Sequence, residues 1–330
     1  MDTSSHSALD VLSALAGSGG LILASDAARF GLQRELRREF EQRNLLRLRR
    51  GVYTATEEWA ALTPDQRYLR RIHAHASSTP GPAVYSHFSA AALWGLPIIG
   101  SWPKEIHLAI PAAAGGRSRH GIVRHPHDSG CDVVDHDGLR VTSVAATAIA
   151  LARVLPFAHA VAAMDKAIHE PRRGRPLTTP QQLESVFADL GRVPGRSAAR
   201  RVLDFASPLS GSPGESISRA GIFLLGFALP EQQTPFWDSD GLIGFTDFFW
   251  RTIGKVGEFD GNGKYLRDEF TGGRTAAEIV IAEKAREDRL RAVNLAVCRW
   301  DWQLATSLPK FGAFLTRHGI PRARSERPPR

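Results

Sequence analysis

Two carboxylates stand in a short stretch of the chain that could carry chemistry. Asp247 lies in an aromatic, β-rich run from Phe245 to Trp250, and Glu258 lies in a second run from Lys255 to Phe259. If Arg251 to Gly254 turn the chain, the two runs form a hairpin that sets the carboxylates side by side. Such a pair suits Mg²⁺ and leaves room for a substrate phosphate. An ordinary hairpin with outward-facing acidic residues explains the spacing equally well.

The acidic pattern continues on both sides of this hairpin. Glu215 lies on an expected helix before it, and the hairpin itself ends in the turn Glu258-Phe-Asp-Gly261. A basic helix and the run Ala296-Val-Cys-Arg-Trp-Asp-Trp302 follow. This order resembles the PD-(D/E)XK nuclease superfamily, and within it the branch similar to very-short-patch-repair endonucleases. The resemblance covers about the last third of the chain.

The resemblance implies hydrolysis of DNA phosphodiester bonds with Mg²⁺, for which Mn²⁺ is the alternative ion. It makes Asp247 and Glu258 metal ligands, adds the carbonyl oxygen of Phe259, and gives Glu215 a supporting catalytic role. Ser212 and Glu215 also have the spacing of a helix capping box, which needs no catalysis. Both interpretations of Glu215 stay open at this point.

One position departs from the superfamily. The residue two after the Glu is usually Lys, and here it is Asp260. Lys264 is the candidate to replace that lysine, by orienting the attacking water or stabilising transition-state charge. The departure supports an alternative from another class, a transcriptional repressor or antitoxin whose nuclease-like domain is inactive and binds a partner. A nucleotidyl-transferring toxin would need a clustered Gly-Ser motif with paired carboxylates, which the sequence lacks.

The N-terminal segment has the element order of a winged helix-turn-helix. Leu9, Leu12 and Leu15 form an apolar helical stripe that glycines end. The expected elements after it are a brief helix through Phe30, a helix over Gln33–Arg43, and a two-stranded wing over Leu45–Arg49 and Val52–Thr54.

Arginines gather where this fold would meet DNA. Eight arginines lie between positions 29 and 50, against three glutamates. Arg34, Arg37, Arg38 and Arg49 are the candidates for phosphate and groove contacts. A solvated helix with Arg–Glu pairs is the alternative, because Arg37 and Glu41 are one helical turn apart.

A second resemblance covers this region. The run LILASDAARFGLQRELRREFEQRNLLRLRRGVYT resembles the N-terminal domain of AbiEi-type antitoxins, which are DNA-binding repressors of type IV toxin–antitoxin operons. The run Ser86-His-Phe-Ser-Ala-Ala-Ala-Leu-Trp-Gly-Leu96 extends the similarity over about the first half of the chain. It implies DNA as a partner and a role in transcription regulation, and it adds a cognate toxin or a second copy of the chain as candidate partners.

Composition limits the classes of protein to consider. Of 330 residues, 43% are hydrophobic and 23% are charged, which is ordinary for a soluble protein with buried cores. No apolar run approaches the ~18 residues needed to span a bilayer, and the start lacks the pattern of a signal peptide. Two cysteines suggest neither a zinc finger nor a disulfide framework. We therefore expect a cytoplasmic protein without membrane contact, and the net charge of +8 favours a nucleic-acid partner.

The predicted fold class is α/β with several domains. The middle segment has strand-like runs at Ile106–Pro111, Ile122–His127 and Leu139–Thr142, and most of its histidines are expected to be structural or exposed. The predicted division is a winged helix DNA-binding domain at 1–65, an α+β middle domain at 66–175, a helical linker at 176–211, a nuclease-like mixed sheet flanked by helices at 212–318, and a disordered basic tail at 319–330.

Overall fold

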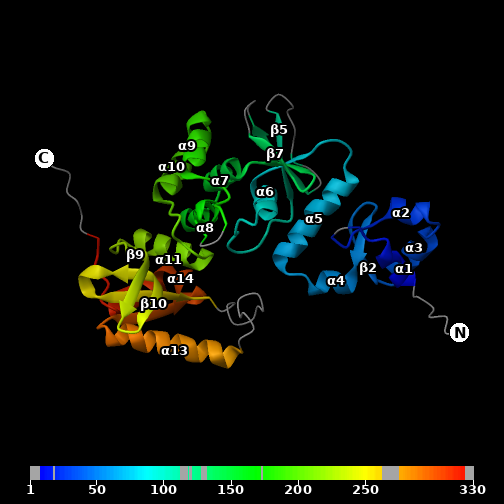
Figure 1. Cartoon of the computed structure of the whole chain (residues 1–330). Helices are drawn as coiled ribbons and strands as arrows, with labels where there is room; N and C mark the ends of the chain where they lie inside the picture. The colour runs from blue at the N-terminus through cyan, green and yellow to red at the C-terminus, as the bar shows by residue number, and fades with distance from the viewer. Residues whose placement is uncertain are drawn as a thin grey trace. The chain divides into compact units, whose positions relative to one another are not determined.

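The structure is a computed structural model that describes residues 8–17, 19–111, 118, 121–127, 132–171, 174–261 and 275–323. The described chain is mixed α/β with three sheets and forms two compact units, residues 1–147 and 148–330 (Figure 1). The predicted α/β class and the presence of several domains are thus confirmed, while the finer division into domains stays a prediction. None of the helices formed by the described residues is long and apolar enough to cross a membrane.

The first unit begins with small helices around a three-stranded sheet of order β1-β3-β2. Its elements are α1 (Ala8–Ala14), β1 (Ile22–Leu23), α2 (Ala24–Arg29), α3 (Gln33–Glu41), β2 (Leu45–Arg49) and β3 (Val52–Ala55). Leu12, Ile22 and Leu36 belong to the core that holds these elements together. The helix α3 ends two residues before the predicted end, since Arg43 has a φ of 65° that a right-handed helix excludes.

The rest of the first unit is built on a five-stranded sheet of order β6-β5-β4-β8-β7. Its elements are α4 (Thr56–Ala61), α5 (Pro64–Ser78), β4 (Val84–Tyr85), α6 (His87–Trp94), β5 (Ile106–Pro111), β6 (Ile122–His127), β7 (Val133–His136) and β8 (Leu139–Thr142). The three strands predicted here are confirmed with their bounds. A capping box of Thr63 and Gln66 begins α5. The five-stranded sheet also contains β4 and β7, which the sequence pattern did not predict.

Helices open the second unit, and a mixed four-stranded sheet follows. The helices are α7 (Val144–Ala152, at the junction of the units), α8 (Phe157–Ile168), α9 (Pro180–Asp189), α10 (Arg196–Phe205) and α11 (Pro213–Leu224). The remaining elements are β9 (Glu231–Asp238), β10 (Gly241–Trp250), the 3₁₀ turn η2 (Arg251–Ile253), β11 (Lys255–Asp260), α13 (Ala276–Ala292), β12 (Ala296–Asp301), α14 (Trp302–Ala305) and α15 (Leu308–Arg317).

In this sheet of order β12-β11-β10-β9, only the β11–β12 pair is parallel. Helices α11 and α14 lie on one side of the sheet and α13 runs along the other (Figure 1). The sequence of helix, three strands, helix and strand was predicted, and the structure confirms it.

Close packing fixes α11 against β11. The rings of Phe248 and Trp300 stack with centroids 5.4 Å apart, and the Trp300 indole N–H donates to Ser218 of α11 over 2.8 Å. A Cβ on Gly214 would lie 2.0 Å from the Phe259 ring, so only glycine allows the helix to approach the strand this closely. Because side chains alternate along a strand, Phe259 faces α11 and its neighbour Glu258 faces α13.

Candidate functional site

The candidate site lies where β10 and β11 separate. Their backbone pairing runs from Trp250↔Lys255 to Phe248↔Gly257, a register that sets Asp247 opposite Glu258. Beyond this point β10 goes on pairing with β9, and β11 goes on pairing with β12. The side chain of Asp247 bridges the opening, since its Oδ2 accepts the backbone N–H of Phe259 over 2.8 Å. We call the group of Asp247, Glu258 and Phe259 the strand fork.

Glu258 is buried, with 6% of its surface exposed. Burial, and after it the neighbouring charge of Asp247, raises the pKa of its carboxyl group to about 7. The guanidinium of Arg286 opposes both effects through its charge and a hydrogen bond. The hairpin therefore brings two carboxylates close enough for each to affect the other's ionisation.

Arg286 is the residue of this site that sequence reasoning missed. It comes from α13, and its Nη2 donates to Glu258 Oε1 over 3.0 Å and to the carbonyl of Phe245 over 2.6 Å. The sequence indicated only that this helix is basic and follows the hairpin. A signal was present, because Arg286 lies four residues before the buried Leu290 and so shares the face of the helix that packs on the sheet.

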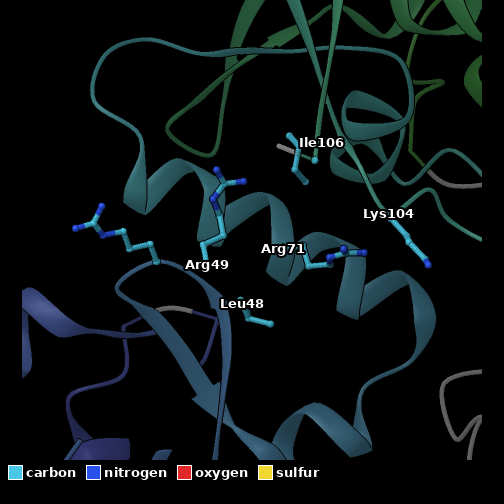
Figure 2. A pocket seen from close by; sticks show the side chains of 7 residues that line it. Leu48, Arg49, Arg71, Lys104 and Ile106 are labelled. Carbon is cyan, nitrogen blue, oxygen red and sulfur yellow. The ribbon is translucent and has the colours of Figure 1, made fainter. Parts of the chain in front are cut away.

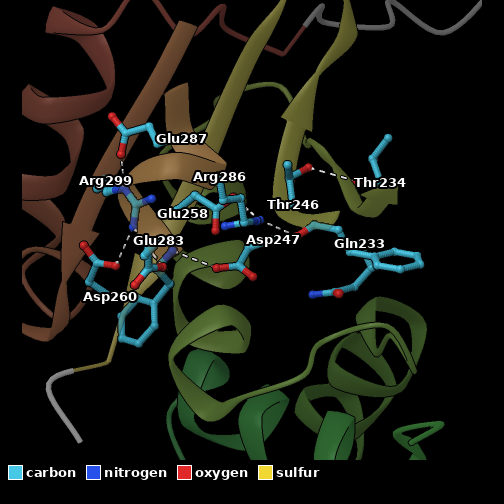
Figure 3. A network of polar contacts seen from close by, with 12 residues as sticks. Gln233, Thr234, Thr246, Asp247, Glu258, Asp260, Glu283, Arg286, Glu287 and Arg299 are labelled. Carbon is cyan, nitrogen blue, oxygen red and sulfur yellow. Dashed lines mark hydrogen bonds and ion pairs between the residues drawn. The ribbon is translucent and has the colours of Figure 1, made fainter. Parts of the chain in front are cut away.

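The position that departs from the nuclease superfamily belongs to a second ion-pair group (Figure 3). Asp260 Oδ1 lies 3.2 Å from Nη1 of Arg299 on the adjacent parallel strand. Arg299 also contacts Glu283 over 3.3 Å and Glu287 over 2.9 Å, both on α13. Asp260 thus helps to hold α13 on the sheet. Lys264, the predicted replacement for the missing lysine, lies outside the described residues.

Glu215 lies at the start of α11 and is 5% exposed. Its backbone N–H donates to Ser212 Oγ over 3.3 Å, which is the predicted N-cap bond. Its carboxylate accepts the Gly211 N–H and the Ser212 hydroxyl, each over 2.8 Å, and the side-chain amide of Gln233 over 3.1 Å. These are the bonds of a carboxylate that orders the beginning of a helix. The catalytic role predicted for Glu215 stays a prediction.

The predicted DNA contacts divide between two elements. Arg34, Arg37 and Arg38 lie exposed on α3, and Arg49 lies on β2. Arg37 Nε pairs with Glu41 over 2.8 Å, and Arg38 pairs with its neighbouring glutamate over 3.3 Å. The Arg37–Glu41 pair is exposed on both sides and contributes only about 0–1 kcal/mol, so a phosphate can replace Glu41 at little cost.

Histidines from three elements meet in the first unit. The rings of His87 and His125 stack with centroids 3.5 Å apart, and His107 Nδ1 lies 2.9 Å from His125 Nε2. Burial, followed by the charge of His125, lowers the pKa of His107 to about 4, so that imidazole is neutral at pH 7. Within the described ranges, no group of three or more His, Cys, Asp or Glu side chains is arranged to hold a metal ion.

The site and its sheet define the second unit as a mixed α/β unit in which buried Glu258 and half-buried Asp247 meet at a strand fork. No family model matches the chain. Two Mycobacterium tuberculosis proteins, the uncharacterized proteins Rv2248 and MT2308, are each 29% identical to it over 264 residues, which is 76% of this chain and 91% of theirs. The crystal structure of the RV2827C protein from the same species aligns with a TM-score of 0.39 and 16% identity, over 69% of this chain and 87% of that one.

Proposed function

We propose that the chain is a DNA-binding protein whose second unit hydrolyses DNA phosphodiester bonds with Mg²⁺ or Mn²⁺. The observation that carries this proposal is the strand fork, where Asp247 and Glu258 oppose each other between separating strands. Mg²⁺ in phosphate-processing sites is usually held by one or two carboxylates, with water and substrate phosphates completing the octahedron. The two carboxylates fit that requirement. Burial, and after it the charge of Asp247, raises the pKa of Glu258, and a divalent cation would oppose both effects.

Each residue of the fork has a role in this proposal. Asp247 and Glu258 hold the ion, which supplies a more acidic water and charge compensation for the phosphate. The N–H of Phe259 faces Asp247. Because the N–H and C=O of one strand residue face the same neighbouring strand, the Phe259 carbonyl is oriented to serve as a further ligand.

Arg286 can take over the electrostatic role of the lysine that Asp260 replaces. Its described hydrogen bonds use Nη2 alone, and a guanidinium has further N–H groups for a phosphate oxygen. A fixed positive charge in a partly buried site stabilises the charge that develops on a phosphate in the transition state. Lys264 remains the second candidate for this role.

The first unit supplies DNA binding in this proposal. The arginines of α3 are exposed, Arg49 of β2 is half-buried, and these side chains can bind backbone phosphates without regard to sequence. The winged helix assignment and the resemblance to AbiEi-type antitoxins belong to the same proposal.

A repressor or antitoxin with an inactive second unit is the other candidate function. The observation that favours it is the ion pair between Asp260 and Arg299, which makes the usual lysine position part of the packing of α13. In that case the second unit is a scaffold for a cognate toxin or for another copy of the chain.

Cleavage of supercoiled plasmid and of single-stranded DNA by the full chain separates these functions. We expect nicking with Mg²⁺ or Mn²⁺ and none with EDTA, and loss of nicking in Asp247→Asn and in Glu258→Gln. Glu231→Gln is the matched control, because Glu231 lies in the same sheet but pairs with Arg251 at the surface. Metal-independent DNA binding without cleavage would favour the repressor, and Asp260→Lys would then test whether cleavage can be gained. Absence of both DNA binding and cleavage would refute both functions.

A further inference from the structure

The first unit contains a basic cavity of about 290 Å³ between the β2–β3 hairpin, α5 and the entry to β5 (Figure 2). Four cations line it: Arg49 and Arg50 at the end of β2 and its turn, Arg71 on α5, and Lys104 before β5. Leu48 and Ile106 give the cavity its apolar wall.

The positive charge of this cavity is not balanced by acidic side chains in its lining. No aspartate or glutamate lines the cavity, and none of the four cations forms an ion pair with a carboxylate in the part of the chain that the structure describes. Arg49 and Arg71 are half-buried, whereas Arg50 and Lys104 are exposed at the mouth. Like charges held together repel one another, so an anion in the cavity would lower the electrostatic free energy of the folded unit.

The charge of Arg49 in this cavity also affects the pKa of the buried His75 on α5. Burial, and after it the charges of Arg49 and Arg124, lowers the pKa of His75 to about 4. His75 accordingly stays neutral at pH 7 and adds no further positive charge. The positive potential of the cavity arises from its three arginines and one lysine.

We infer that this cavity binds a phosphate group, and that in the DNA complex the occupant is a backbone phosphate of the duplex. Guanidinium groups match phosphate oxygens with paired hydrogen bonds, and a lysine adds a point charge. The cavity volume lies at the lower end of the ~300–1,000 Å³ of pockets that enclose drug-sized ligands, which suits a phosphate with part of its sugar. A polymer of phosphates is favoured over a free anion because the neighbouring strand carries a further exposed arginine, Arg47.

This inference rests on the proposed DNA binding and extends it. Arg71 and Lys104 lie beyond residue 65, the predicted end of the winged helix domain. The DNA-binding surface would therefore include α5 and the segment before β5, and the α+β region would contact DNA as well as support the N-terminal elements.

The test measures binding of the full chain to a fluorescent duplex over a range of salt concentrations. The pocket variant is Arg71→Gln with Lys104→Gln. Its control is Arg140→Gln with Lys166→Gln, which removes the same charge from two exposed sites outside the cavity. We expect the pocket variant to lose at least about tenfold in affinity and the slope of log K against log salt to fall by about one. The control variant should match the wild type.

Further measurements make each result decisive. Circular dichroism and the melting temperature verify folding, and Arg50→Gln, an exposed change at the mouth, serves as the test if the pocket variant unfolds. Thermal shifts with inorganic phosphate identify the source of the phosphate. If the pocket and control variants bind the duplex equally, the inference is wrong and the proposed DNA binding stands. If the wild type binds no duplex but phosphate stabilises it and not the pocket variant, the phosphate site stands and the proposed DNA binding fails. If neither ligand binds, both are wrong.

Discussion

Replacing Glu258 by Gln should stabilise the metal-free protein at neutral and alkaline pH. Glu258 is buried beside Asp247, and the folded state raises the pKa of its carboxyl group from 4.5 to about 7. A raised pKa in the folded state means that folding favours the protonated form. The contribution of Glu258 to stability is therefore complete below pH 4.5 and is lost as the pH rises through 7. Gln has the shape of the protonated acid and does not ionise.

The size of the effect follows from the shift in pKa. Each pKa unit corresponds to about 1.4 kcal/mol, so ionised Glu258 costs the folded state about 3 kcal/mol at pH 8. This figure already includes the stabilising charge and hydrogen bond of Arg286. In the variant, Arg286 can still donate a hydrogen bond to the amide oxygen of the glutamine. At about 2–4 °C per kcal/mol for a unit of this size, E258Q should melt about 6–12 °C above the wild type at pH 8. At pH 5 the difference in stability should fall below about 1 kcal/mol.

Thermal unfolding in EDTA between pH 5 and 8 measures this difference directly. Glu231→Gln is the control, because the bond from Arg251 lowers the pKa of Glu231, so that variant should gain nothing as the pH rises. Mg²⁺ at about 100 times its dissociation constant should add about 2.7 kcal/mol to the wild type at pH 8, and less to E258Q. The reasoning fails if E258Q melts below the wild type at pH 8, or if the gap between them does not change with pH.

Three further predictions concern the helices and the sheet. Ser212→Ala should cost about 0.5–2 kcal/mol of stability through the lost N-cap. Glu215→Gln should leave the Mg²⁺-dependent rise in melting temperature unchanged. If Glu215→Gln loses that rise while its stability in EDTA is normal, Glu215 belongs to the metal site. The double variant Arg37→Ala with Arg38→Ala should weaken duplex binding by the full chain and reduce the salt slope of that binding by up to about two. Its helix content, measured by circular dichroism, should not change. Unaltered binding would exclude α3 as the helix that faces DNA. Gly257→Ala should cost about 1–3 kcal/mol in denaturant unfolding, since its Cβ would lie 2.5 Å from the ring of the tryptophan on β12, and an unchanged midpoint would refute this packing.

The elements that the sequence predicted well are those with local signals. The bounds of β5, β6, β8 and β9 follow from β-rich runs, and proline or capping residues mark the starts of α5 and α9. The β10–β11 hairpin was predictable because a short turn joins two apolar runs and fixes their register. A local signal of this kind was enough to bring Asp247 and Glu258 together.

What the sequence did not predict depends on contacts between distant segments. The two-residue strand β4 has too few residues for an alternating pattern, and it exists because β5 and β8 pair with it from either side. Arg286 lies 28 residues after Glu258, and only the packing of α13 on the sheet brings them together. The basic cavity likewise collects cations from separate elements, and each of them looks like an ordinary surface charge in the sequence.

The side chains of the two candidate sites carry opposite net charge, and this difference determines how each site could bind DNA, which is a polyanion. The cavity of the first unit has cations and no carboxylate in its lining, so a phosphate can bind there directly. The described residues around the strand fork have the reverse balance. Two guanidinium groups stand in a network of five carboxylates, namely Arg286 and Arg299 with Asp247, Glu258, Asp260, Glu283 and Glu287. A DNA phosphate would be repelled by this group unless a divalent cation lay between them. Under the proposed function, DNA binding by the first unit should therefore be independent of metal, whereas engagement of DNA by the strand fork should require a divalent cation.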